Sequence, residues 1–112
     1  MKAVFHHSND DPELHARVVG NIANLLDDET IDIEAVALVA NSGGLELLKA
    51  TSQQREQIMD LIDRGVTAKQ CSNTIEGTDV SEDDLIEGVE LVSSGVGELT
   101  RLQNEGYAYI NP

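Results

Sequence analysis

Apolar and polar residues follow one another in a pattern that predicts strands separated by helices. Residues 2–8 are apolar at the centre and polar at the end, as in a short strand. Asp11 and Pro12 are residue types preferred at a helix N-cap and at the first helical position. Apolar residues at helical spacing come next: Leu14, Val18, Ile22, Leu25 and Leu26. The pattern predicts a helix that ends near residues 27–28.

The middle of the chain repeats this order of strand and helix. Residues 33–40 are almost continuously apolar, which is typical of a central parallel strand covered on both faces. The polar segment 41–44 ends that strand, and a short helical turn over residues 45–49 precedes a longer helix over residues 52–64. Thr51 and Gln54 have the spacing of a capping box, and Gly65 is a typical helix stop.

The last part of the chain begins with a predicted third strand at residues 66–71. Two further strands, with a helix between them, are predicted after it. Residues 72–77 suit a short helix, and Ser81 begins a small turn with an acidic residue at its third position. Residues 89–92 read as a fourth strand. A helix over residues 96–105 stops at Gly106, and residues 107–110 form a fifth strand.

Strands joined through helices cannot pair as hairpins, so we expect parallel strands with right-handed crossovers. The fold class predicted is α/β, a three-layer α/β/α sandwich with a five-stranded parallel sheet. At 112 residues, the chain has the size of a single domain over residues 1–112. Its 40% apolar content argues against disorder.

Four strand ends predict a binding site, because ligands of open parallel sheets gather beyond the carboxyl ends of the strands. The segments that leave these ends are 6–9, 41–44, 71–73 and 93–97, and all are rich in small and polar residues. The candidate residues for binding a substrate or an anion are His6, Ser8, Asn41, Ser42, Ser72, Asn73, Ser94, Gly95 and Gly97. We therefore expect the site at this edge of the sheet.

Cys71, the single cysteine, is the candidate catalytic residue. It ends the third predicted strand and is followed by Ser72 and Asn73, so its sulfur would lie near backbone amides that stabilise a thiolate. Lys69, two residues earlier on the same strand face, could add a positive field, although such a lysine more often extends into solvent. The alternative interpretation of Cys71 is a quiet, buried cysteine.

Acidic residues dominate the charge of the chain, with 21 Asp and Glu against 7 Lys and Arg and a formal charge of −14. A surface of this sign repels nucleic acids and anionic membranes, so neither is predicted as a partner. The acidic residues are spread along the chain, which favours an adaptation to a salt-accumulating cell over one acidic patch for a cationic partner. With no predicted signal segment or membrane span, we expect a cytoplasmic location.

The histidines and aromatic residues indicate no cofactor. His6 and His7 point to opposite faces of the first strand, so only one can reach the site, and His15 is expected at the surface. No spaced ligand motif predicts a metal. The segment 93–97 lacks the lysine of a phosphate-binding loop, and three aromatic residues leave few rings for a flavin. Tyr107 and Tyr109 share a strand face and are expected at a subunit contact or a sheet edge.

Three segments resemble the DsrE/DsrF-like family of small sulfur-relay proteins, here in an acidic member of haloarchaeal type. They are the His-Ser-Asn-Asp-Asp-Pro turn after the first strand, Gly-Val-Thr-Ala-Lys-Gln-Cys-Ser-Asn-Thr at 65–74, and residues 93–110 with Ser-Gly-Val-Gly-Glu-Leu. The resemblance implies a parallel α/β/α sheet and homo-oligomers, trimers or hexamers. In active members it implies a cysteine that carries sulfane sulfur as a persulfide, and here that cysteine can only be Cys71.

Two functions follow as hypotheses. The first is a sulfur carrier of sulfurtransferase type, which accepts sulfur on Cys71 and passes it to an acceptor thiol. Because the chain has one cysteine, the donor and acceptor would be other proteins or small thiols. The second is a non-catalytic oligomeric module of the same fold, which binds a small molecule or a protein partner at the carboxyl edge of the sheet.

The acidic surface predicts that salt stabilises the protein. Repulsion among like charges opposes the compact state in dilute buffer, and molar salt screens it over a Debye length of about 3 Å. We expect the melting temperature to rise between dilute buffer and molar KCl, as measured by circular dichroism. A melting temperature that does not rise would contradict the adaptation to a salt-accumulating cell.

Overall fold

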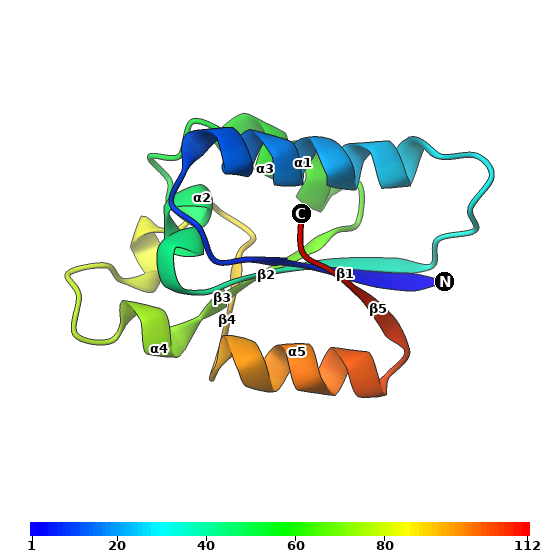
Figure 1. Cartoon of the computed structure of the whole chain (residues 1–112). Helices are drawn as coiled ribbons and strands as arrows, with labels where there is room; N and C mark the ends of the chain where they lie inside the picture. The colour runs from blue at the N-terminus through cyan, green and yellow to red at the C-terminus, as the bar shows by residue number, and fades with distance from the viewer.

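The structure, a computed structural model that describes all 112 residues, has a five-stranded parallel sheet at its centre (Figure 1). The strands are β1 (Lys2–His7), β2 (Ala35–Ala40), β3 (Thr67–Cys71), β4 (Glu90–Val92) and β5 (Tyr107–Ile110). They lie in the order β4-β3-β2-β1-β5. The predicted α/β fold with an all-parallel sheet is therefore confirmed, and the strand expected at the centre is the central one.

Helices cover both faces of this sheet, with α1 and α3 on one face and α5 on the other (Figure 1). The helical elements are α1 (Pro12–Asp27), η1 (Ser42–Gly44), α2 (Leu45–Leu48), α3 (Arg55–Asp63), α4 (Ser72–Ile75), η2 (Glu82–Asp84) and α5 (Gly95–Asn104). None of them is a long apolar helix of the kind that spans a lipid bilayer.

The core is divided by the sheet into two unequal parts. Alternate residues of β2 point to opposite faces, so that Val36 and Leu38 join a cluster of 15 buried residues beneath α1, α2 and α3. Ala37 and Val39 face the other way and pack against Leu99 in a cluster of only 5 residues beneath α5. A single helix therefore closes the second face, and its position depends on few apolar contacts.

The start of α3 differs from the prediction. The helix begins at Arg55, and the expected capping box of Thr51 and Gln54 is wrong, because the Ser52 hydroxyl accepts a hydrogen bond from the Gln54 amide at 3.1 Å instead. This local turn holds the backbone in a non-helical conformation for three residues more. The predicted cap at Ser81 is confirmed, since Ser81 and Asp84 form a reciprocal capping box at η2.

His15 lies in the interior, so the expectation of a surface position is wrong. It is 6% exposed and contacts the equally buried His7 with the two rings edge to face, 4.9 Å apart between centroids. His15 Nε2 bonds to the carbonyl oxygen of Asn9 at 2.9 Å, which satisfies a polar group at this buried position. His7 Nε2 has no such partner.

Burial and, to a smaller extent, the neighbouring His15 together lower the pKa of His7 to about 4. The unfolded chain, where the value is 6.5, therefore takes up the proton first. The contribution of neutral His7 to the stability of the folded protein is therefore complete above about pH 6.5. It is lost as the pH falls towards the pKa of His7 in the folded protein.

We expect acid to destabilise the protein through His7, by about 3 kcal/mol at pH 4. Urea unfolding of the wild type and of His7→Phe between pH 7 and 4, at one KCl concentration, measures this contribution. The carboxylates titrate in both proteins, so the difference between the two curves isolates His7. Parallel curves would show that protonation of His7 does not oppose folding.

Candidate functional site

A cavity of about 420 Å³ opens at the carboxyl edge of the sheet, where β2, β3 and β4 end. Eight residues line it: Asn41, Ser42, Cys71, Asn73, Thr74, Ser94, Gly95 and Val96. None of these residues is charged, although the chain has 21 acidic and 7 basic residues. Amides, hydroxyls and one sulfur atom are therefore the groups that can act in this cavity.

Cys71 is the last residue of β3 and the N-cap of α4, so the chain turns sharply at the sulfur. The residue is 5% exposed and lines the cavity, which places it at the bottom of an opening to solvent. Backbone amides of the turn and of the neighbouring α5 converge on the sulfur, where they can hold an anion.

The surroundings of Cys71 favour its thiolate. Burial raises the pKa of the thiol, but hydrogen bonds from the Thr74 hydroxyl and from the amides of Gly95, Thr74 and Asn73 lower it. These hydrogen bonds outweigh burial, and the pKa lies below its ordinary value. A thiolate is the nucleophilic form of cysteine, so the site increases the reactive fraction of the sulfur.

The Thr74 hydroxyl is oriented by a residue from another loop. The Ser42 amide donates to Thr74 Oγ at 2.9 Å, so the hydroxyl proton is free to point at Cys71. Ser42 has a φ of +48°, a left-handed conformation that few residues other than glycine adopt. The strained turn after β2 thus places the Ser42 amide where it orients the Thr74 hydroxyl beside Cys71.

The N-terminus of α5 approaches Cys71 through Gly95. A Cβ atom at Gly95 would lie 3.4 Å from Cys71 Cβ and 3.2 Å from Asn41 Cβ, so a larger residue would push these groups apart. Ser94 caps the helix by accepting from the Gly97 amide at 2.8 Å. The Gly95 amide reaches the sulfur, whereas the Gly97 amide is occupied by the cap.

Asn41, in the turn after β2, belongs to a series of hydrogen-bonded side chains that continues through β1 to β5. His6 Nε2 lies 3.0 Å from Asn41 Oδ1, and His6 Nδ1 lies 2.5 Å from the Tyr109 hydroxyl. Tyr109 stands on β5, the edge strand, and is 43% exposed. These hydrogen-bonded side chains connect the edge of the sheet with the wall of the cavity.

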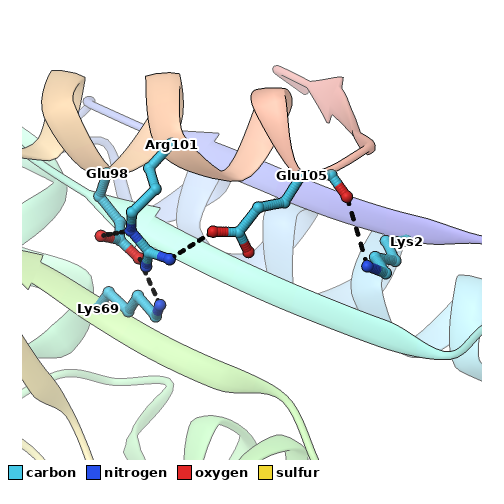
Figure 2. A network of polar contacts seen from close by, with 5 residues as sticks. All are labelled: Lys2, Lys69, Glu98, Arg101 and Glu105. Atoms are coloured by element: carbon cyan, nitrogen blue, oxygen red, sulfur yellow. Dashed lines mark hydrogen bonds and ion pairs between the residues drawn. The ribbon is translucent and has the colours of Figure 1, made fainter.

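Lys69 does not extend into solvent, and its charge is paired with the carboxylate of Glu98. Figure 2 shows Lys69 and Arg101 converging on the carboxylate of Glu98, while Arg101 also reaches Glu105 at 2.7 Å. Burial raises the pKa of Glu98, but the hydrogen bonds and charges of the two basic residues lower it below its ordinary value. This network ties α5 to β3 and leaves dipoles as the groups that stabilise an anion in the cavity.

The remaining candidate residues lie elsewhere. Ser8 is exposed and lies outside the cavity lining, and Ser72 and Gly97 are also absent from it. His6 stands behind Asn41. Sequence reasoning missed Thr74 and Tyr109 as contributors. Thr74 could have been predicted, because it is the third residue of a helix whose N-cap is Cys71. No feature of the sequence around Tyr109 indicates its contact with His6.

No three His, Cys, Asp or Glu side chains gather closely enough to hold a metal ion.

The loops that follow β2, β3 and β4 together form a small polar cavity around a sulfur whose thiol has a lowered pKa. Such an arrangement suits a nucleophilic thiol that exchanges with sulfur compounds entering from solvent.

The profile of the DsrE/DsrF-like family matches residues 2–112. The chain belongs to the DsrE/DsrF-like family. Among solved structures it is similar to MTH1491 of Methanobacterium thermoautotrophicum, a protein of unknown function, with 38% identity and a TM-score of 0.91 over 99% of this chain and 98% of that one.

The fold is also that of the ychN protein of E. coli, with a TM-score of 0.72 and 18% identity over the full length of both chains. No curated protein matches the sequence. The resemblance to the family that the motifs suggested is thus confirmed over essentially the whole chain.

The hydroxyl of Thr74 can be tested without changing the shape of the site. We expect Thr74→Val to reduce alkylation of Cys71 by iodoacetamide at neutral pH roughly three- to tenfold, because a hydrogen bond to the thiolate is lost. Thr74→Ser keeps the hydroxyl and serves as the matched control. The rate is measured against pH, and profiles that coincide for the two variants would contradict the role of this hydroxyl.

Proposed function

We propose that this protein is a sulfur carrier that accepts sulfane sulfur as a persulfide on Cys71 and passes it to an acceptor thiol. The observation that carries the proposal is that Cys71 lines an open cavity while hydrogen bonding from the Thr74 hydroxyl and from three nearby backbone amides lowers the pKa of its thiol. Membership of a family associated with sulfur relay supports it. Each of these donors stabilises an anionic sulfur, which is the form that reacts.

The transfer consists of two exchanges. The Cys71 thiolate attacks the outer sulfur of a donor persulfide R–S–SH, so that a new S–S bond forms to Cys71 and the old S–S bond breaks. The donor leaves as the thiolate R–S⁻, which takes a proton from water. An acceptor thiolate then attacks the outer sulfur on Cys71, and Cys71 returns to its thiolate.

The donor and the acceptor are separate molecules under this proposal, since Cys71 is the only cysteine of the chain. The cavity has room for the additional sulfur atom beside Cys71. A trimer or hexamer, expected from the family resemblance, stays a prediction.

The burial of Cys71, which is 5% exposed, favours a second candidate function. A sulfur this enclosed fits a non-catalytic module in which the cavity binds a small molecule or a partner and the thiol does not react. The two functions differ in what happens to the mass and the reactivity of the folded protein.

We expect incubation with a small-molecule persulfide to add about 32 Da, the mass of one sulfur atom, to the wild type and nothing to Cys71→Ser. Intact-mass spectrometry of the folded protein measures this addition. Added acceptor thiol should then remove it. A protein that stays at its original mass, with a thiol that resists alkylation until it is unfolded, would contradict the carrier function and favour the binding module.

A further inference from the structure

The side chain of Asn41 can face the cavity with either its oxygen or its nitrogen, and the neighbouring residues decide which. His6 Nε2 lies 3.0 Å from Asn41 Oδ1. An amide oxygen only accepts hydrogen bonds, so His6 Nε2 must carry the proton and donate it. This assignment holds for both the neutral and the protonated imidazole.

Tyr109 fixes the other end of the imidazole. When Nε2 carries the proton of a neutral ring, Nδ1 is an acceptor, and the Tyr109 hydroxyl at 2.5 Å is the donor that it requires. All hydrogen bonds in the chain from Tyr109 through His6 to Asn41 then run in the same direction. The Asn41 oxygen accepts the hydrogen bond from His6, and the two N–H groups of the Asn41 amide remain available to donate.

The available N–H groups and Cys71 approach the same glycine and line the same cavity. Asn41 Nδ2 is 3.4 Å from the position that a Cβ of Gly95 would occupy, and Cys71 Cβ is 3.4 Å from the same position. Asn41 also lines the cavity that Cys71 faces. An atom attached to the sulfur of Cys71 therefore enters a space with the Asn41 amide at its wall.

We propose that the amide of Asn41 donates a hydrogen bond to the outer sulfur of a persulfide on Cys71, and that His6 and Tyr109 are positioning residues that hold this amide in the donating orientation. The proposal rests on the carrier function. It gives a role to a contact between β5, β1 and the turn after β2 that the fold alone does not require.

The inner and outer sulfur atoms need different donors. The Thr74 hydroxyl and three backbone amides act on the sulfur of Cys71 itself, whose thiol pKa they lower. In a persulfide, the negative charge resides on the outer sulfur, which lies farther into the cavity. A donor on the cavity wall is therefore the group best placed to bind the outer sulfur.

The test compares neutral variants of similar size. Asn41→Leu removes the amide and keeps the side-chain shape. Tyr109→Phe removes the hydroxyl that sets the tautomer of His6, so that the imidazole can accept from Asn41 and turn the amide oxygen towards the cavity. Tyr107→Phe is the matched control, because Tyr107 stands on the same strand and packs against the smaller core cluster.

The persulfide is prepared without any sulfur donor, by converting Cys71 to a mixed disulfide and displacing the small thiol with sulfide. Near-ultraviolet absorbance then measures the pH at which the persulfide ionises. We expect this midpoint to rise by about one pH unit in Asn41→Leu, equivalent to a tenfold smaller ionised fraction below the midpoint. It should rise in Tyr109→Phe by a smaller amount and stay unchanged in Tyr107→Phe.

The ionisation of the unloaded thiol provides the second readout. It should change less than that of the persulfide, because the donors to the inner sulfur are retained. A persulfide midpoint unchanged in Asn41→Leu, or equal shifts for thiol and persulfide, would overturn the proposal and indicate a structural role only. A wild type that fails to load from a persulfide donor contradicts the carrier function, while this titration still decides the role of Asn41.

Discussion

The N-terminus of α5 lies directly against the carboxyl end of β3, because Gly95 has no side chain to keep the two apart. This contact brings an α5 amide to the sulfur of Cys71 and closes one wall of the cavity. It is held from a distance by the buried carboxylate of Glu98, which binds Lys69 of β3 (Figure 2). Since only a small apolar cluster lies beneath α5, this ion pair fixes the helix where packing alone would leave it less constrained.

The fold could be predicted because the apolar pattern is locally consistent. The buried run of β2 indicates a strand covered on both faces, and the stripe of α1 has the period of a helix with one buried side. The strand order could not be predicted, since pairing between strands depends on contacts far apart in sequence. The start of α3 and the burial of His15 were missed for a related reason. A single hydrogen bond decides each of them, from the Gln54 amide to the Ser52 hydroxyl and between His15 and the Asn9 carbonyl oxygen, and no periodicity records such bonds.

The candidate site was predictable in its location and less so in its details. Parallel strands deliver their exit loops to one edge, so residues such as Asn41 and Gly95 could be placed near Cys71 from the order of elements alone. The orientation of groups within the cavity depends on backbone conformation instead. Ser42 adopts a left-handed turn that aims its amide at Thr74, and a sequence pattern does not indicate which serine will do so.

The cavity is free of charged side chains in a chain whose formal charge is −14. Lys69, the nearest basic residue along β3, is paired with Glu98, so amide and hydroxyl dipoles are the groups that lower the pKa of the Cys71 thiol. Dipoles fixed at hydrogen-bonding distance attract no mobile counterion to the site and are weakened little when ions accumulate around the molecule. The surroundings of the Cys71 sulfur are thereby insulated from the ionic composition of the solvent, although the chain as a whole carries a large excess of negative charge.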